Sequence, residues 1–340
     1  MGRVDLARLV FDEMRVKNLI SWNTMIDGYM RNGKGHFDEA LEWFREMQIS
    51  GVEPDYVAII SVLAACANVG MLGLGLGLWI HRFVLKQDFS DNVRVNNSLI
   101  DVYSRCGCIE FAHQVFKRTR KRTQVSWNSI IVGFAISGFA EESLEYFKLM
   151  QNEGFKPDGI SFTGALTACS HAGLIDNGLR YFDVMKRVYR ISPRIEHYGC
   201  IVDLYSRAGD WREALNVVEN MSVKPNEVVL GSLLAACRTK GNVSLAERIM
   251  KYLVDLDPDG DFNYVILANM YAAVGRWDGA GKNRRKMKEL GIQKKPGISS
   301  VEIGSSIHEF MVGDKSHIET ENIYAMLELL SFDLRLCGEY

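Results

Sequence analysis

The chain lacks the net positive charge expected of a protein that binds nucleic acid mainly through the phosphate backbone of the nucleic acid. It has 40 Lys and Arg against 42 Asp and Glu, with a formal net charge of -2 and a pI of about 6.4. Because Lys and Arg contacts with phosphates dominate such binding, this balance argues against a simple electrostatic mode. Two local basic runs occur, at 117–122 and 284–288, and such runs are typical of solvated helix ends or phosphate contacts.

A disulfide framework and a membrane span are also missing. The seven cysteines are odd in number and scattered, which indicates a reducing compartment. Cys66, Cys169 and Cys237 occupy the same place in related segments, which predicts small buried residues between close helices. No apolar run approaches the roughly 20 residues of a membrane span, so no membrane partner is expected. No targeting segment is recognisable, and we expect the amino terminus to be truncated relative to a natural precursor.

Repetition at a spacing of about 105 residues is the strongest feature that the sequence does have. Three different segments return in the same order: Ser21–Ile26 as Ser126–Ile131, Leu63–Cys66 as Leu166–Cys169, and Leu99–Arg105 as Ile201–Arg207. Self-similarity at a fixed period is the signature of a repeat array. The large period therefore contains three smaller units of about 31 to 37 residues.

Each unit has the hydrophobic pattern of two amphipathic helices. In residues 124–158 the two apolar stripes consist of Trp127, Ile130, Ile131 and Phe134, then Leu144, Phe147 and Met150. Gly138 and Gly154 mark the helix ends. Strand-like alternation is not sustained anywhere. We therefore predict an all-α fold, a right-handed α-solenoid of helix-turn-helix repeats with a mostly helical carboxy-terminal extension.

The units divide the chain into four parts. Residues 1–18 are predicted to be the second helix of a truncated repeat. Six repeats follow at 19–55, 56–92, 93–123, 124–158, 159–194 and 195–226. An extension of two helix pairs covers 227–297, and a short β-like segment and a terminal helix complete 298–340.

These features resemble the plant pentatricopeptide repeat family, in the class with alternating standard, long and short repeats and an E-type carboxy-terminal extension. The resemblance rests on Val125–Ile131, Met150–Asp158, Leu166–Gly173, Ile195–Tyr198, Leu204–Gly209 and Asn269–Trp277, and covers nearly all 340 residues. Within the family, the chain is similar to a chloroplast-development factor that acts in plastid RNA editing.

Repeats of this family bind one RNA base per helix pair through two or three side chains. In the family, the fifth residue of the first helix and the last residue of the unit face the base edge, while the second residue packs on the base plane. By this resemblance the base-edge residues are Asn23, Asp55, Asn92, Asn97, Thr123, Asn128, Asp158, Thr163 and Asn226. The base-packing residues are Ile20, Val57, Arg94, Val125 and Ile160.

Paired by unit, these residues imply base preferences. Two units pair Asn with Asp, namely Asn23 with Asp55 and Asn128 with Asp158. By family resemblance, Asn paired with Asp favours uracil. Asn97 with Thr123 favours a pyrimidine, and among the pyrimidines cytosine. The other units are expected to discriminate less well between bases. Their pairs are Ile60 with Asn92, Thr163 with Arg194, and Gly199 with Asn226.

Structural roles compete with these assignments. Asn near a helix start is a common cap, although the recurrence of Asp at the end of the same units favours a ligand contact. Trp22 and Trp127 can stack on bases, but their spacing is more typical of a core between repeats. An Arg plane such as that of Arg94 can stack on a base. Glu196, at the packing position of the sixth unit, would repel a phosphate.

The resemblance implies a sequence-specific, single-stranded RNA-binding factor that recognises sites for organellar C-to-U RNA editing. The extension from residue 227 onward would then dock proteins and recruit a deaminase in trans. The implied partners are single-stranded organellar RNA, a DYW-type deaminase and multiple organellar RNA editing factor proteins. The implied location is the chloroplast, with the mitochondrion as the alternative.

No catalytic activity, metal or cofactor is expected in the chain itself. His317-Ile318-Glu319 matches the first element of a zinc deaminase, but only Cys337 follows it where a Pro-Cys-x-x-Cys element is required. Cys106 and Cys108 have no second cysteine pair nearby. Two other functions remain open: RNA splicing or transcript stability, and a purely protein-binding helical scaffold of the tetratricopeptide kind.

Overall fold

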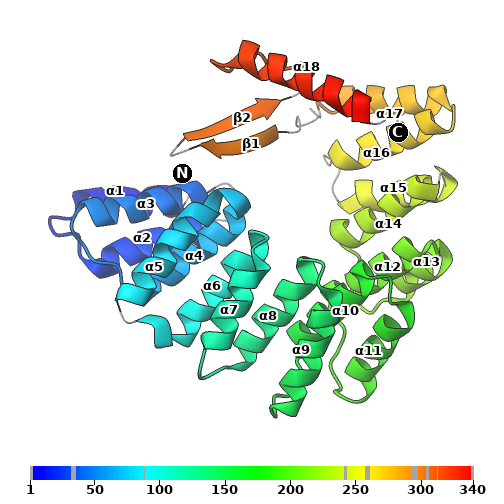
Figure 1. Ribbon diagram of the computed structural model, residues 1–340. Helices are drawn as coiled ribbons and strands as arrows, with labels where there is room; N and C mark the ends of the chain where they lie inside the picture. The colour runs from blue at the N-terminus through cyan, green and yellow to red at the C-terminus, as the bar shows by residue number, and fades with distance from the viewer. Residues whose placement is uncertain are drawn as a thin grey trace. The chain divides into compact units, whose positions relative to one another are not determined.

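The computed structural model describes residues 3–31, 36–87, 89–240, 243–256, 261–291, 298–303, 306–311 and 313–337. The chain forms two compact units, residues 1–284 and 285–340. In the described part of the chain, the first unit is built from helices and the second contains a two-stranded hairpin and a long helix (Figure 1). The unit boundary falls inside helix α17 rather than at residue 227, where the sequence pattern changes.

Helices of the first unit alternate between two structural roles. The first helices of the pairs are α2 (Leu19–Arg31), α4 (Tyr56–Val69), α6 (Val93–Arg105), α8 (Gln124–Ile136), α10 (Gly159–His171), α12 (Ile195–Ala208), α14 (Glu227–Lys240) and α16 (Asp261–Ala273). The second helices are α1 (Arg3–Glu13), α3 (Phe37–Ile49), α5 (Leu74–Lys86), α7 (Ile109–Arg118), α9 (Ala140–Asn152), α11 (Ile175–Arg187), α13 (Trp211–Asn220), α15 (Val243–Leu256) and α17 (Trp277–Glu289). Two short 3-10 helices, Gly70–Gly73 and Phe89–Asp91, flank α5.

Two helical layers follow from how these helices pack. Each first helix from α2 to α16 contacts the first helices next to it in the series, so these helices form one continuous layer. From α2–α3 to α14–α15, each first helix also contacts the second helix of its own pair. Within the described residues, each pair packs mainly on its neighbours, so the array is quasi-one-dimensional. The predicted α-solenoid is confirmed, and α14 to α16 continue it beyond the six predicted repeats.

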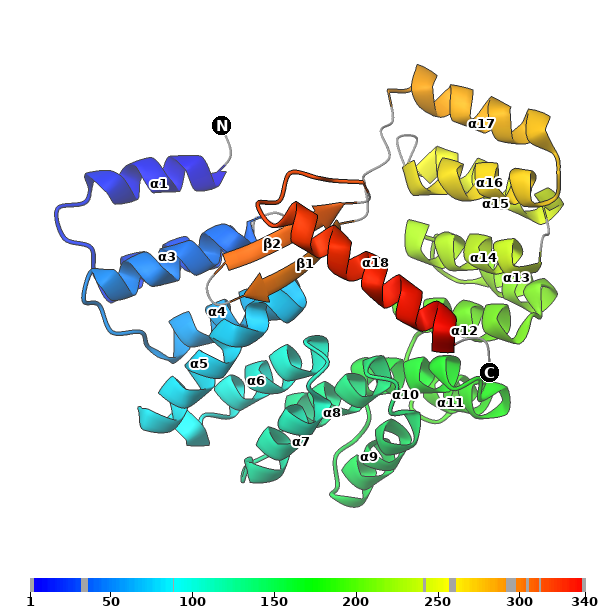
Figure 2. The ribbon, with the colours of Figure 1, turned by 45° about the horizontal axis from the view of Figure 1, so that its top comes forward.

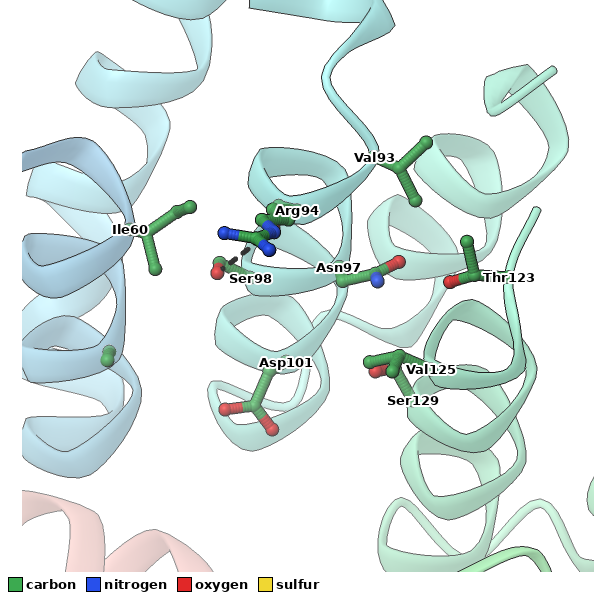
Figure 3. A pocket seen from close by; sticks show the side chains of 10 residues that line it. Ile60, Val93, Arg94, Asn97, Ser98, Asp101, Thr123, Val125 and Ser129 are labelled. Carbon is green, nitrogen blue, oxygen red and sulfur yellow. Dashed lines mark hydrogen bonds between the residues drawn. The ribbon is translucent and has the colours of Figure 1, made fainter. Parts of the chain in front are cut away.

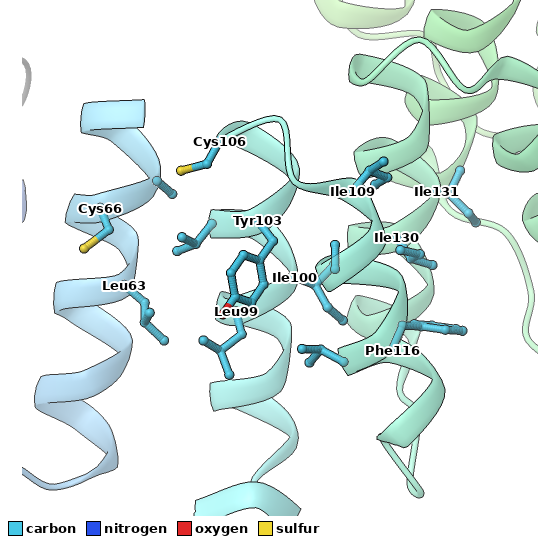
Figure 4. Close-up of a cluster of buried hydrophobic side chains, with 14 of the residues drawn as sticks. Leu63, Cys66, Leu99, Ile100, Tyr103, Cys106, Ile109, Phe116, Ile130 and Ile131 are labelled. Carbon is cyan, nitrogen blue, oxygen red and sulfur yellow. The ribbon is translucent and has the colours of Figure 1, made fainter. Parts of the chain in front are cut away.

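The core lies between the two layers and contains the predicted apolar stripes. All seven stripe residues of 124–158 are buried. Figure 4 shows one part of this core, where side chains from α4, α6, α7 and α8 meet around Tyr103. The predicted glycine stops at Gly138 and Gly154 have φ values of 84° and 82°, a conformation that other residues rarely adopt.

The repeated cysteines are core residues, as predicted. Cys66, Cys169 and Cys237 are all buried. Burial raises the pKa of the Cys66 thiol to about 12 and those of Cys169 and Cys237 to about 11. These thiols therefore stay protonated and pack as small apolar side chains.

The close approach between α4 and α5 requires a glycine at residue 73. A Cβ atom at Gly73 would lie 2.5 Å from the carbonyl oxygen and 2.7 Å from the Cα of Cys66. Because both are backbone atoms of α4, they cannot rotate away. Gly73→Ala is expected to lower the free energy of unfolding by about 1–3 kcal/mol, measured by urea denaturation. The control Gly28→Ala, which meets nothing within 4 Å inside α2, is expected to keep or increase stability. Equal stability of both variants would contradict the packing argument.

The second unit contains a hairpin and the terminal helix. Strands β1 (Ile298–Ile303) and β2 (Ser306–Met311) pair antiparallel, with Ile298 opposite Met311 (Figure 2). Helix α18 spans Thr320–Cys337, and its Tyr324 hydroxyl donates to the Asp314 carbonyl at 3.2 Å. Both strands and α18 lie within residues 298–340. Among the described helices, none combines the length and apolar character needed to cross a bilayer.

Candidate nucleic-acid interface

Asn128 and Asp158 are joined by hydrogen bonds across two neighbouring first helices. Asn128 is the fifth residue of α8, and Asp158 is the N-cap of α10, which packs beside α8. The Asn128 Nδ2 donates to both carboxylate oxygens of Asp158 at 3.1 Å. The pair therefore forms one polar unit in which an amide donor adjoins a carboxylate acceptor.

Ser161 fixes the orientation of this pair, and sequence reasoning missed it. Its hydroxyl donates to Asn128 Oδ1 at 2.6 Å, and its backbone N–H donates to Asp158 Oδ1 at 3.0 Å. Within the described residues, Asp158 Oδ2 accepts only from Asn128, so this carboxylate oxygen retains capacity to accept a further hydrogen bond. The sequence signal for Ser161 is its capping-box position three residues after Asp158.

The hydrogen bonds also set the charge state of Asp158. Burial by itself raises the pKa of this carboxyl, but donors from the Ser161 backbone and side chain, Asn128 and the Ile160 backbone together lower it below the ordinary value of 3.8. The carboxylate therefore stays ionised at neutral pH and acts as an acceptor only.

This lowered pKa predicts a pH dependence of stability. The ionised form of Asp158 is stabilised in the folded state, so its contribution is present above the ordinary value of 3.8 and is lost as pH falls through the lower folded pKa. We expect wild type to be more stable than Asp158→Asn near neutral pH and the difference to shrink below pH 3.8. Urea midpoints measured over this pH range test it, and a difference that does not depend on pH would contradict it.

Asn23 and Asp55 repeat the arrangement one large period earlier. The Asn23 Nδ2 donates to Asp55 Oδ1 at 3.0 Å. The same oxygen caps α4 by accepting from the backbone N–H of Val57 at 3.1 Å and of Ala58 at 2.9 Å. Ala58 stands where the other pair has Ser161, and Asn23 Oδ1 is buried with no hydrogen-bond partner. The Asn–Asp contact is thus shared, while its orienting hydroxyl is not.

Asn97 and Thr123 face a pocket of about 740 Å³ between α4, α6 and α8 (Figure 3). Asn97 is 9% exposed, and its Oδ1 has no hydrogen-bond partner. Thr123 caps α8 through Ser126, and no hydrogen bond joins it to Asn97 in the described part of the chain. The pocket is also lined by Ile60 and Arg94, so it combines apolar walls with a buried free acceptor.

The other base-edge residues have local structural contacts. Asn92 accepts from the Arg94 backbone N–H at 3.0 Å and caps α6, and Asn226 accepts from the Val229 backbone N–H at 3.0 Å at the start of α14. Thr163 donates to the Gly159 carbonyl at 3.0 Å. Among the described residues, no hydrogen bond joins Thr163 to its predicted partner. These side chains therefore bond within or beside their own helices, whereas each Asn–Asp contact joins two neighbouring first helices.

The packing residues form an exposed apolar series in the layer of first helices. Ile20, Val57, Val125 and Ile160 are between 40% and 74% exposed, each at the second position of its helix, and Arg94 is also exposed there. Val228 has the same position on α14 and is 72% exposed, so the series continues past the predicted repeats. The sequence analysis missed Val228, although it follows Asn226 as Ile160 follows Asp158.

The two tryptophans are core residues rather than ligand contacts. Trp22 and Trp127 are each 3% exposed and lie among aromatic side chains. The ring centroids of Trp127 and Phe116 are 5.0 Å apart, and those of Trp22 and Phe11 are 4.8 Å apart. The structure thus confirms the prediction that both tryptophans pack between helices.

The histidine of the His-x-Glu element is engaged in local bonds. His317 Nε2 lies 2.7 Å from His308 Nδ1, and His317 Nδ1 accepts from the Glu319 backbone N–H at 3.0 Å. The Cys106 thiol donates to the Gly70 carbonyl at 3.1 Å, and burial raises its pKa. In the part of the chain that the structure describes, no group of three His, Cys, Asp or Glu side chains is placed to hold a metal ion.

Family models match most of this architecture. The PPR repeat family model matches residues 17–68, the PPR repeat model matches 97–122, 125–155 and 196–224, and the pentatricopeptide repeat domain model matches 146–208. The E motif model matches residues 240–302. The chloroplastic pentatricopeptide repeat-containing protein At1g05750 of Arabidopsis thaliana is 60% identical to the chain, over 99% of the chain and 73% of that relative. The chain belongs to the pentatricopeptide repeat family.

Other pentatricopeptide repeat proteins are also similar to the chain in sequence or in fold. At1g59720 (chloroplastic/mitochondrial) and At1g08070 (chloroplastic), both from Arabidopsis thaliana, are 45% and 40% identical over 99% of the chain. The chain spans about half the length of these two relatives, 54% and 45%. The crystal structure of the pentatricopeptide repeat protein PPR10 in complex with an 18-nt psaJ RNA element superposes with a TM-score of 0.66. That match, at 19% identity over 86% of the chain and 44% of PPR10, establishes the shared solenoid fold.

Proposed function

We propose that this protein binds single-stranded organellar RNA in a sequence-specific manner and selects sites for C-to-U editing. The observation that carries the proposal is the hydrogen-bonded Asn–Asp pair, which occurs twice in the same register. In both cases an exposed apolar side chain, Ile20 or Val125, lies three residues before the Asn. Each pair can thus hold one base by its edge while the apolar residue covers its plane.

The chemistry of the pair favours uracil. In the Asn128 and Asp158 pair, the amide nitrogen is the donor, and carboxylate Oδ2 has capacity to accept. A uracil edge offers a carbonyl acceptor beside the N3–H donor, so both hydrogen bonds can form together. Cytosine offers an amine and an unprotonated N3, and its amine would meet the amide N–H. Each such pair of hydrogen bonds contributes about 1–3 kcal/mol of discrimination against a wrong base.

The pocket at Asn97 favours a different base. Its buried Oδ1 has no protein partner, so a ligand that donates a hydrogen bond there would satisfy it. The exocyclic amine of cytosine is such a donor. With one base per unit, the units at 19–55, 56–92, 93–123 and 124–158 then specify uracil, any base, cytosine and uracil in that order.

Editing rather than binding alone is supported by the E motif at residues 240–302. By family resemblance, members that only bind RNA usually lack this extension. We propose that the extension docks a DYW-type deaminase or multiple organellar RNA editing factor proteins, which raises the deaminase concentration at one cytidine. Relatives with chloroplastic and mitochondrial names support an organellar location, and the chloroplast is the one we propose.

Selection from a random RNA pool with the purified full chain tests the base order. The expected product contains two uracils separated by two nucleotides, with cytosine immediately before the second uracil, in the orientation that places the edited cytidine downstream. Retained RNA with no base enrichment at the two uracil positions would contradict sequence-specific reading. Absence of RNA binding would instead favour the protein-binding scaffold.

A further inference from the structure

Among the six repeats at 19–226, the one at 93–123 carries the most positive charge. Residues 93–123 contain seven Lys and Arg and two Asp and Glu, a net charge of +5. The rest of the chain contains 33 basic and 40 acidic residues, a net charge of -7. Five of the seven basic residues fall within 117–122, and no other connector between helix pairs has more than two. The overall charge therefore conceals a local basic site.

Helix stability accounts for three of these five basic residues. Lys117 and Arg118 lie in the last turn of α7, where cations interact favourably with the helix dipole. Arg122 donates from Nε to the Phe116 carbonyl at 3.2 Å and from Nη2 to the Lys117 carbonyl at 3.3 Å. Its guanidinium also lies 4.7 Å from the centre of the Phe116 ring. These three residues complete the end of α7.

Arg120 and Lys121 have no such structural role. Both are exposed, and neither side chain makes a hydrogen bond, ion pair or ring contact within the described residues. They belong to the connector that ends at Thr123, which lines the 740 Å³ pocket. Because consecutive Cα atoms are about 3.8 Å apart, the Cα of Lys121 lies within about 8 Å of that of Thr123. Arg120 and Lys121 therefore lie within three residues of the pocket lining.

The pocket itself has a second source of positive charge. Arg94 lines it from α6, is exposed, and has no ion pair in the described part of the chain (Figure 3). The only acidic lining residue, Asp101, is paired with Arg105 at 3.0 Å. A ligand in this pocket is therefore bordered by cations on the α6 wall and beside the connector. Such an environment favours an anionic group next to the buried Asn97 acceptor.

We propose that Arg120 and Lys121 bind the RNA phosphodiester backbone beside the base held at Asn97 and Thr123. The repeat at 93–123 then anchors the strand by its phosphates, while the Asn–Asp pairs on either side select bases. This division matches the general rule that phosphate contacts position a nucleic acid and base contacts specify its sequence. The inference rests on the proposed function, since it assigns a second chemistry to the same RNA-binding surface.

The salt dependence of RNA affinity tests this assignment. Each lost phosphate contact on a single strand reduces the slope of log K against log salt by about 0.7. We expect the double variant Arg120→Gln with Lys121→Gln to make this negative slope shallower by about 0.7 to 1.4. We also expect it to weaken binding about 5- to 25-fold near 0.1 M salt. The probe is an oligonucleotide with the U-N-C-U order. Preference among the four bases at the uracil positions is expected to stay unchanged.

A matched control separates a local site from general charge. Arg82→Gln with Lys86→Gln removes the same charge from exposed positions on α5, in the layer of second helices, and is expected to keep the wild-type slope. The exchange Arg120→Lys with Lys121→Arg is expected to retain affinity. A wild-type slope in the Arg120 and Lys121 double variant, or an equal loss in the α5 control, would overturn the phosphate site. Absence of RNA binding by wild type would overturn the proposed function itself.

Discussion

Asn128→Thr is expected to shift the preferred base at one RNA position from uracil to guanine. The substitution removes the amide N–H that would donate to the uracil carbonyl, while Asp158 remains as an acceptor held by Ser161. Guanine presents two adjacent N–H donors, which a carboxylate can accept, and in the family Thr with Asp favours guanine. Loss of the paired hydrogen bonds to uracil, at about 1–3 kcal/mol, corresponds to a change in base discrimination of about 5- to 150-fold. Competition binding with oligonucleotides that differ at this one base measures it.

The repeat provides its own control for this experiment. Asn23→Thr changes the equivalent residue of the other Asn–Asp pair and is expected to shift the other uracil position, three nucleotides away. Each variant should leave the second position unchanged, because the two pairs belong to different units. If both variants kept the wild-type preference among all four nucleotides, the assignment of the Asn–Asp pairs as base-recognition residues would be contradicted.

Trp127→Ala is expected to lower the free energy of unfolding by about 3–5 kcal/mol. Trp127 is 3% exposed, and its ring contacts Phe116, Tyr146 and Phe155. Removing the indole therefore leaves a cavity lined by aromatic side chains that cannot fill it without moving helices. Urea denaturation followed by circular dichroism measures the loss. Because repeat arrays can unfold in parts, the transition near α8 is the relevant one.

Trp277→Ala is the matched control for the tryptophan prediction. Trp277 is 70% exposed at the start of α17, so its removal is expected to change stability by no more than about 0.5 kcal/mol. A Trp127→Ala variant that is as stable as Trp277→Ala would show that Trp127 is not a core residue. That result would favour the alternative role of Trp127, in which its ring stacks on an RNA base.

Local pattern made most of the fold predictable. The stripes of 124–158 have helical spacing, and Gly138 and Gly154 supply stops with positive φ, so both helices follow from nearest-neighbour physics. Repetition then extends one helix pair to the whole array, because each described pair packs mainly on its neighbours. The Asn128–Asp158 contact could be anticipated by resemblance alone, since its two residues lie 30 positions apart.

Features that depend on neighbouring helices were not predictable. Ser161 orients Asn128 across 33 positions, which a capping-box pattern does not reveal. The exposure of Val228 depends on α14 packing beside α12, although the sequence pattern changes at residue 227. The sequence also leaves the basic run at 117–122 open between helix ends and phosphate contacts. The hydrogen bonds of Arg122, which only the structure shows, assign this residue to the end of α7. Arg120 and Lys121 make no such bonds within the described residues.

Sequencing of chloroplast and mitochondrial cDNA from plants with and without the gene, compared with genomic DNA, tests the central claim most directly. We predict that one or a few cytidines lose C-to-U conversion in the chloroplast, each preceded by bases that fit the U-N-C-U order. Normal editing at every cytidine in both organelles would contradict an editing function. If introns or transcript ends changed in that case, the function would be RNA processing, and if no transcript changed, it would be a protein-binding scaffold.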